Sequence, residues 1–138
     1  EKDLRDVYHL LALLESDAAA VVASQASEAQ LEELNALHQQ LHKAAPESDK
    51  STTAFFALNE RFHTVLLEIA NNRWRDQLVA DLRKVMKLNR QHSLLKSGRV
   101  AQSLAEHDAI MSALNRRAPQ QARQAMADHF TKGLEAAN

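Results

Sequence analysis

Three histidines of this 138-residue sequence stand where a helix would normally present an apolar side chain to a protein core. They are His63, His107 and His129, and each falls on an apolar stripe at helical spacing. Asn59 precedes His63 by four residues, so the two side chains share one helical face. Burying an unpaired imidazole costs roughly 1–3 kcal/mol. If the three rings meet in one core, a shared metal ion explains them better than packing does.

This combination of donors indicates the kind of ion. Three imidazoles and a side-chain oxygen suit Zn²⁺, and also Ni²⁺ or another first-row divalent ion. We therefore predict a metal site formed by Asn59, His63, His107 and His129, with positions left open for water or a carboxylate. The alternative is a metal-free core, because a single histidine on an apolar stripe more often bonds to a backbone carbonyl.

Four other histidines serve as controls. His38 and His42 are also four residues apart, as in a zinc-binding pair, but no third ligand is evident near them. We predict that they lie on a polar helix surface. His9 and His92 are isolated and receive no role.

The sequence offers little for catalysis. It contains no Gly-rich phosphate loop, HExxH motif or GxSxG motif. Glu60 and Glu106 stand directly beside the candidate ligands Asn59 and His107 in sequence, so each lies about 100° around its helix from that ligand. Neither is an obvious general base.

The composition predicts an almost entirely helical protein. Only two glycines and two prolines interrupt a chain rich in Ala, Leu, Glu, Gln and Arg. Apolar spacing predicts helices over about 3–23, from about 28 to before Pro46, about 53–70, 74–95, 99–114, and from Pro119 onward. Short connections favour antiparallel neighbours, so residues 1–138 are expected to form one all-α domain, an antiparallel bundle of six to seven helices.

Helix boundaries are marked by specific residues. Ser27 with Gln30 is typical of a capping box, and Asn71-Asn72 should end a helix. Ser51, Thr52 or Thr53 could cap the helix that follows the predicted loop PESDKSTT.

Charge and cysteine content suggest a cytoplasmic protein without a membrane role. There is no cysteine, no apolar run of about 20 residues and no signal-peptide pattern. A net charge of −1 gives no indication of the basic surface that nucleic-acid-binding proteins usually have. Residues 73–99 nevertheless carry eight bases against two acids, which predicts either a solvated basic helix face or attraction of an anion.

Three runs give the sequence a family resemblance: LLALLESDAAAVVA, LNERFHTVLLEIANNR and SLAEHDAIMSALNRRAPQQARQAMADHF. They resemble the effector-binding C-terminal (FCD) domain of FadR-type regulators in the GntR superfamily, in the same order and spacing and over nearly the whole chain. The resemblance implies a six- or seven-helix bundle. In many members, three histidines and an acid hold a divalent metal beneath a cavity for a small organic acid.

The resemblance can be carried over residue by residue. His63 matches the first histidine of the family pattern, His107 the Glu-His histidine and His129 the last one. Asn59 stands where the family has an acid, and this neutral amide is a weaker ligand than a carboxylate. The ion's charge would then remain uncancelled, so we expect an anionic effector and the metal to bind with positive coupling.

A second departure concerns the effector. Many relatives have an arginine at the position of Leu11, four residues before the acid that matches Glu15. Another cation must then hold an effector carboxylate. The candidates are Arg83, Lys87 and Arg90, with snorkelling surface cations as the alternative.

The resemblance implies the ligand-sensing and dimerising domain of a bacterial transcriptional regulator. We expect a homodimer, a small carboxylate effector, and DNA binding only through a winged helix-turn-helix domain upstream of this chain. No enzymatic activity is expected. The alternatives are a metal-dependent hydrolase-like enzyme, in which the ion activates water, and a metal-free helical interaction module.

Overall fold

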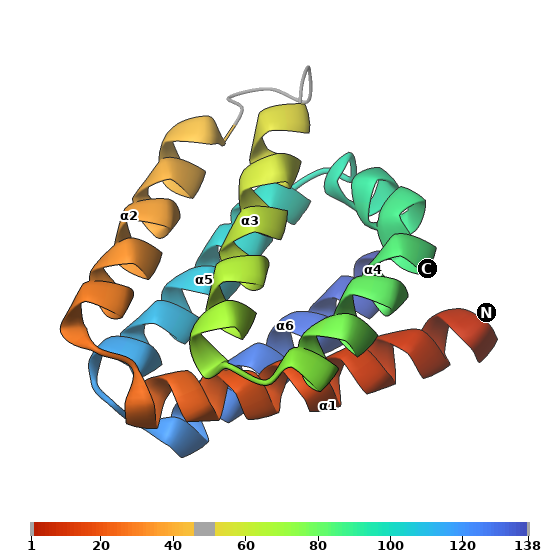
Figure 1. Cartoon of the computed structure of the whole chain (residues 1–138). Helices are drawn as coiled ribbons and strands as arrows, with labels where there is room; N and C mark the ends of the chain where they lie inside the picture. The colour runs from red at the N-terminus through yellow and green to blue at the C-terminus, as the bar shows by residue number, and fades with distance from the viewer. Residues whose placement is uncertain (1, 46–51, 138) are drawn as a thin grey trace.

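The computed structural model describes residues 2–45 and 52–137, and all regular secondary structure within these ranges is α-helical. Six helices follow one another along the chain (Figure 1): α1 (Lys2–Gln25), α2 (Glu28–Ala44), α3 (Thr53–Ala70), α4 (Arg73–Leu94), α5 (Arg99–Asn115) and α6 (Pro119–Ala137). The prediction of an all-α bundle is confirmed, and the helix boundaries lie within a few residues of the expected ones.

Local sequence signals set several of these boundaries. The Ser27 side chain accepts a hydrogen bond from the Gln30 amide, and the Gln30 side chain accepts one from the Ser27 amide. This is the predicted capping box. Asn71 ends α3 in the left-handed conformation, with φ 59°, and the Asn72 side chain caps α4 by accepting from two backbone amides.

The predicted loop between α2 and α3 falls largely on residues 46–51, which lie outside the described residues. Of the three predicted caps, Ser51 belongs to that segment. Thr52 occupies the N-cap position of α3 but makes no side-chain capping bond, and Thr53 is the first helical residue.

The packing of the helices brings distant parts of the chain around one core. α1 lies along α6, α5 also packs on α6, and α2 lies beside α3 (Figure 1). The largest fully buried side chains come mainly from α3 and α5, with Met126 from α6 and further ones from α1 and α2; those of α3 and α5 include Phe55, Phe62, Leu66, Ile110 and Leu114. Residues on the apolar stripes of α3, α5 and α6 therefore point into the same interior.

Helix α1 is long and apolar enough, by length and composition, to cross a membrane. Half of its most apolar stretch is buried inside the bundle, against α6, α3 and other helices. We therefore interpret α1 as a core helix.

Candidate metal centre

The three core histidines meet. His63 on α3, His107 on α5 and His129 on α6 each offer a ring nitrogen, and these nitrogens lie within 4.8 Å of one another. The ring centroids are 4.7 to 5.4 Å apart, and all three residues are buried. The predicted convergence is confirmed, and the geometry is compact enough that the three rings could hold a metal ion.

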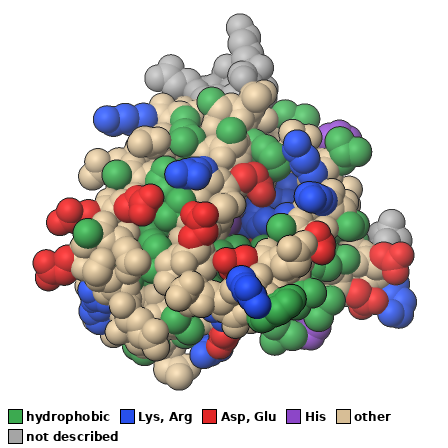
Figure 2. All heavy atoms as spheres, viewed as in Figure 1, with side chains coloured by type: hydrophobic (Ala, Val, Ile, Leu, Met, Phe, Trp, Pro, Cys, Tyr) green, Lys and Arg blue, Asp and Glu red, His purple; other side chains and the backbone are tan. Residues whose placement is uncertain are grey.

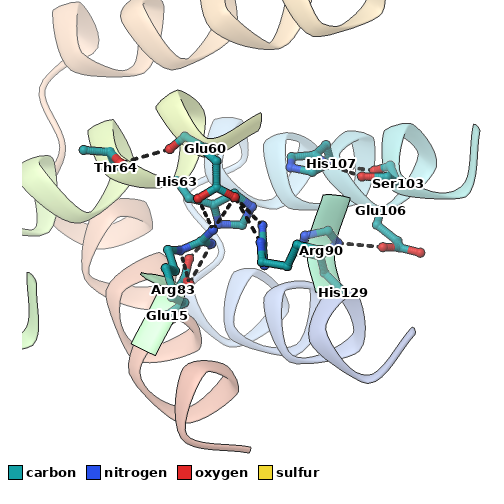
Figure 3. Close-up of polar contacts among 10 residues, drawn as sticks. All are labelled: Glu15, Glu60, His63, Thr64, Arg83, Arg90, Ser103, Glu106, His107 and His129. Carbon is teal, nitrogen blue, oxygen red and sulfur yellow. Dashed lines mark hydrogen bonds and ion pairs between the residues drawn. The ribbon is translucent and has the colours of Figure 1, made fainter. Parts of the chain in front are cut away.

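Each ring is oriented by a partner at its Nδ1 atom (Figure 3). Nδ1 of His63 lies 2.6 Å from Glu15 Oε1, and Nδ1 of His129 lies 2.6 Å from Glu106 Oε1. The third ring, His107, donates from Nδ1 to the Ser103 carbonyl oxygen at 2.7 Å. A histidine that donates from Nδ1 keeps a lone pair on Nε2, which is the arrangement found around metal ligands.

Three buried polar atoms of the centre have no protein partner. Within the described part of the chain, Nε2 of His63, Nε2 of His107 and Oδ1 of Asn59 are buried without a hydrogen bond. The alternative of an ordinary core histidine accounts for one nitrogen of His107, through Ser103, but not for the other. These three atoms have unshared lone pairs and lie beside a third histidine, so together they offer the ligand atoms that a divalent ion needs.

Burial also sets the protonation of the rings. It lowers the pKa of His63 and His107 well below the ordinary value of 6.5, and nearby positive charge, that of Arg83 foremost for His63, acts in the same direction. Burial lowers the pKa of His129 as well, although the Glu106 carboxylate opposes the shift. The rings are therefore neutral near pH 7, which is the form that ligates metals.

A buried ion-pair network surrounds the rings. Arg83 donates to Glu15 at 2.8 and 3.1 Å, and also to Glu60 at 2.9 Å. A second arginine, Arg90, reaches Glu60 at 2.8 Å (Figure 3). On the other side, Arg99 forms a two-pronged pair with Glu106 at 2.7 and 3.0 Å. Three carboxylates thus face three guanidinium groups, so their formal charges cancel without a metal ion.

A small cavity of about 30 Å³ adjoins the centre. Asn59 and His129 form part of its wall, together with the two cations Arg90 and Arg99. The remaining lining residues are Tyr8, Phe56, Ser93, Leu94, Ser103, Phe130 and Gly133. This volume accommodates one or two water molecules, so an organic acid could enter only if the walls move.

The predicted effector residues occupy three different environments. Arg83 is buried and bonded to Glu15 and Glu60, whereas Arg90 is buried and lines the cavity. Lys87 is exposed and lines a groove of about 510 Å³ between α3 and α4. Basic side chains lie around a hollow in this region of the surface (Figure 2). The alternative of snorkelling surface cations is therefore wrong for both arginines.

Sequence reasoning missed three residues of the centre, namely Glu15, Arg99 and Glu106 as ring and ion-pair partners. Arg99 and Glu106 are seven residues apart on α5, which places them two turns apart on one face, so this pair could have been found. Glu15 reaches His63 from α1 across 48 positions of sequence, and no local signal predicts that contact.

One prediction from the sequence is wrong. His38 and His42 do have a third potential ligand, because Asp108 of α5 lies 2.7 and 2.8 Å from their Nε2 atoms. The predicted surface position holds for His42, whose side chain is 45% exposed, whereas the side chain of His38 is partly buried and only 14% exposed. The error arose because Asp108 is 70 residues from His38 and meets it only through the packing of α2 on α5.

Comparison with known proteins identifies the family of the chain. The sequence profile of the family described as "FCD domain" matches residues 6–132. The chain is also 26% identical over 136 residues to YdhC of Bacillus subtilis (strain 168), described as an uncharacterized HTH-type transcriptional regulator. That alignment covers 97% of this chain and 59% of YdhC, so the chain spans a little over half of its relative's length.

Proposed function

This chain belongs to the FCD domain family, and we propose that it is the ligand-sensing domain of a bacterial DNA-binding transcriptional regulator. The relationship to YdhC supports a regulatory rather than a catalytic role, so the hydrolase-like alternative is set aside. The DNA-reading part would be a winged helix-turn-helix domain outside residues 1–138. Such a regulator works in the cytoplasm.

The observation that carries this proposal is the group of unpaired acceptors in the core. His63, His107 and His129 would hold a divalent ion through Nε2, with Asn59 offering Oδ1 as a further ligand. Zn²⁺ is the first choice for this combination, and Ni²⁺ or another first-row ion would also suit it. When bound, the ion would supply a Lewis-acidic positive charge at the wall of the cavity.

Charge balance favours an anionic effector. The four proposed ligands are neutral, and the surrounding carboxylates are already matched by arginines. A bound ion would therefore add two uncancelled positive charges to a buried site, which a small carboxylate would offset. Of the cations predicted from the sequence, Arg90 is the best placed to hold that carboxylate, because it lines the cavity. We add Arg99, which lines it too.

Binding would also change the shape of the domain. A cavity of about 30 Å³ must widen to admit an organic acid, so effector binding selects an altered packing of the helices that line it. These helices include α4, α5 and α6. The resulting shift would alter the relative placement of two DNA-reading domains, with a coupling typically of about 1–3 kcal/mol.

We propose a homodimer as the working form. Exposed apolar side chains on α1 and α4 support it: Leu10, Leu13, Trp74, Leu78, Val85 and Leu88. Apolar side chains gather on the surface over α1 in Figure 2. Exposed apolar patches commonly mark protein contacts, and a two-fold dimer matches the symmetric half-sites read by helix-turn-helix regulators.

Two measurements test the proposed function. Elemental analysis of the protein purified without chelator should find close to one buried ion per chain, and absence of metal even after Zn²⁺ addition would support the metal-free alternative. Calorimetric titration with a panel of small carboxylates, among them acetate, malate and citrate, should then show tighter binding to the Zn²⁺-loaded domain than to the metal-free domain. Equal affinities in both forms would show that ion and effector bind independently, and would refute the proposed coupling.

A further inference from the structure

A second cluster of metal-binding side chains lies outside the core, between α2 and α5. It consists of His38 and His42 of α2 and Asp108 of α5, and its donor atoms lie within 4.8 Å of one another. The cluster is separate from the core histidines, because Asp108 follows His107 and so projects about 100° further around α5.

The orientation of the three side chains is that of a chelating site. Nε2 of His38 and Nε2 of His42 approach the same carboxylate oxygen, Oδ1 of Asp108, at 2.7 and 2.8 Å. The two rings are four residues apart on one helix, and their centroids are 4.8 Å apart. In a tetrahedral zinc site neighbouring ligand atoms are about 3.3 Å apart, given metal–ligand distances of about 2.0–2.1 Å. Small rotations of the three side chains would therefore open room for an ion.

The cluster is also accessible from solvent. The side chains of His42 and Asp108 are 45% and 53% exposed, whereas His38 is 14% exposed and fixes one side of the site. An ion could enter without any change in the core, and water could complete its coordination. Two imidazoles and one carboxylate suit Zn²⁺, Ni²⁺ or Cu²⁺ better than Mg²⁺ or Ca²⁺, which prefer oxygen ligands alone.

From this arrangement we propose a second, peripheral site for a first-row divalent metal ion, formed by His38, His42 and Asp108. An ion there joins α2 to α5, which are otherwise linked on this side by the paired amides of Asn35 and Asn115. The proposal is independent of the core centre and stands whether or not that centre binds metal.

The structure also indicates the relative strength of the two sites. When Nε2 of a neutral histidine binds metal, the ring proton moves to Nδ1. In His38, Nδ1 is buried and has no hydrogen-bond partner among the described residues, so that proton would face no acceptor. In the core centre every Nδ1 atom has an acceptor. Zn²⁺ is therefore expected to bind more weakly at the peripheral site than in the core.

The test is the number of Zn²⁺ ions per chain. The domain is stripped with chelator, dialysed against a series of Zn²⁺ concentrations, and analysed for metal and protein content. The variants His42→Ala and Asp108→Asn are compared with the control His92→Ala, which removes an exposed histidine of α4. A matched control for the carboxylate is Asp128→Asn on α6. Circular dichroism checks that each variant is folded.

We expect His42→Ala and Asp108→Asn each to bind about one ion fewer than the controls, or to bind that ion at least about tenfold more weakly. Zn²⁺ should also raise the melting temperature of the controls more than that of His42→Ala. The proposal is overturned if His42→Ala binds as much Zn²⁺ as His92→Ala, because the cluster is then only a hydrogen-bonded contact. His129→Ala separates this result from the core centre, since it should lose the core ion and keep the peripheral one.

Discussion

Acidification of the metal-free domain should reveal the buried histidines directly. Burial lowers the pKa of His63 and His107 well below 6.5, so the folded chain resists protonation at these two rings. In the unfolded chain both rings take up protons normally below pH 6.5. The unfolded state therefore binds more protons than the folded state, and the free energy of unfolding must decrease as the pH falls below 6.5.

The size of this effect follows from the number of rings. For each histidine that stays neutral in the folded domain, lowering the pH from 7.0 to 5.5 costs about 1 kcal/mol of stability. His63 and His107 together should then cost about 2–3 kcal/mol. His129 should add less, because its ring faces the Glu106 carboxylate, which opposes the lowering of its pKa. This loss is a large share of the roughly 5–15 kcal/mol by which domains are usually stable.

Denaturant unfolding in the presence of EDTA measures this directly. Urea titrations followed by circular dichroism at pH 7.0, 6.5, 6.0 and 5.5 give the free energy of unfolding at each pH. The acids with lowered pKa values, such as Glu60 and Glu106, start from an ordinary value of 4.5 and do not titrate in this window.

Two variants make the test specific. His107→Gln removes one buried ionisable ring, so the loss of stability between pH 7.0 and 5.5 should shrink by about 1 kcal/mol. His92→Gln removes an exposed ring and should leave the loss unchanged. A free energy of unfolding that is the same at both pH values in the wild type would show that the rings are not buried in neutral form, and would refute the reasoning.

Three further predictions concern the metal itself. His107→Ala should abolish binding of the core Zn²⁺ and destabilise the domain by about 2–4 kcal/mol, because it leaves a cavity; dialysis and urea unfolding measure the two effects. Glu106→Gln should lower the affinity of the core site for Zn²⁺ by about 10–100-fold, because the carboxylate that orients His129 is lost. Competition with a chromogenic chelator measures this affinity. Asn59→Asp should increase the affinity for Zn²⁺ in the same assay, because a carboxylate is a stronger ligand than an amide. In calorimetry it should reduce the preference of carboxylates for the Zn²⁺-loaded domain, because the new negative charge offsets part of the charge of the ion. An unchanged preference would contradict the charge argument.

Much of the fold could be predicted because its signals are local. The capping box at Ser27 and the Asn71-Asn72 break each involve residues that are neighbours in sequence, and the structure confirms both. The convergence of the three histidines could be predicted for a related reason. Each one occupies an apolar stripe, and a domain of this size has a single core into which such stripes can point.

The partners of the histidines could not be predicted in the same way. The bond between His63 and Glu15 joins α3 to α1, and the contact between His38 and Asp108 joins α2 to α5. Such contacts depend on how one helix is rotated and shifted against another, and hydrophobic periodicity gives the buried face of a helix but not its register against a neighbour. The burial of Arg83 and Arg90 was missed for the same reason, because each is neutralised by an acid on another helix.

The hydrogen bond from His63 to Glu15 has a mechanical consequence. Glu15 lies 13 residues from Lys2, so a tilt of α1, which would also shift its packing on α6, acts over a length of about 20 Å. A tilt of about 5° at the pivot beside the metal ligand would displace the Lys2 end of the helix by roughly 2 Å. In the proposed regulator, that end is the one nearest to the DNA-reading domain. A sub-ångström adjustment around the ion would thus be magnified before it reaches the part of the protein that contacts DNA.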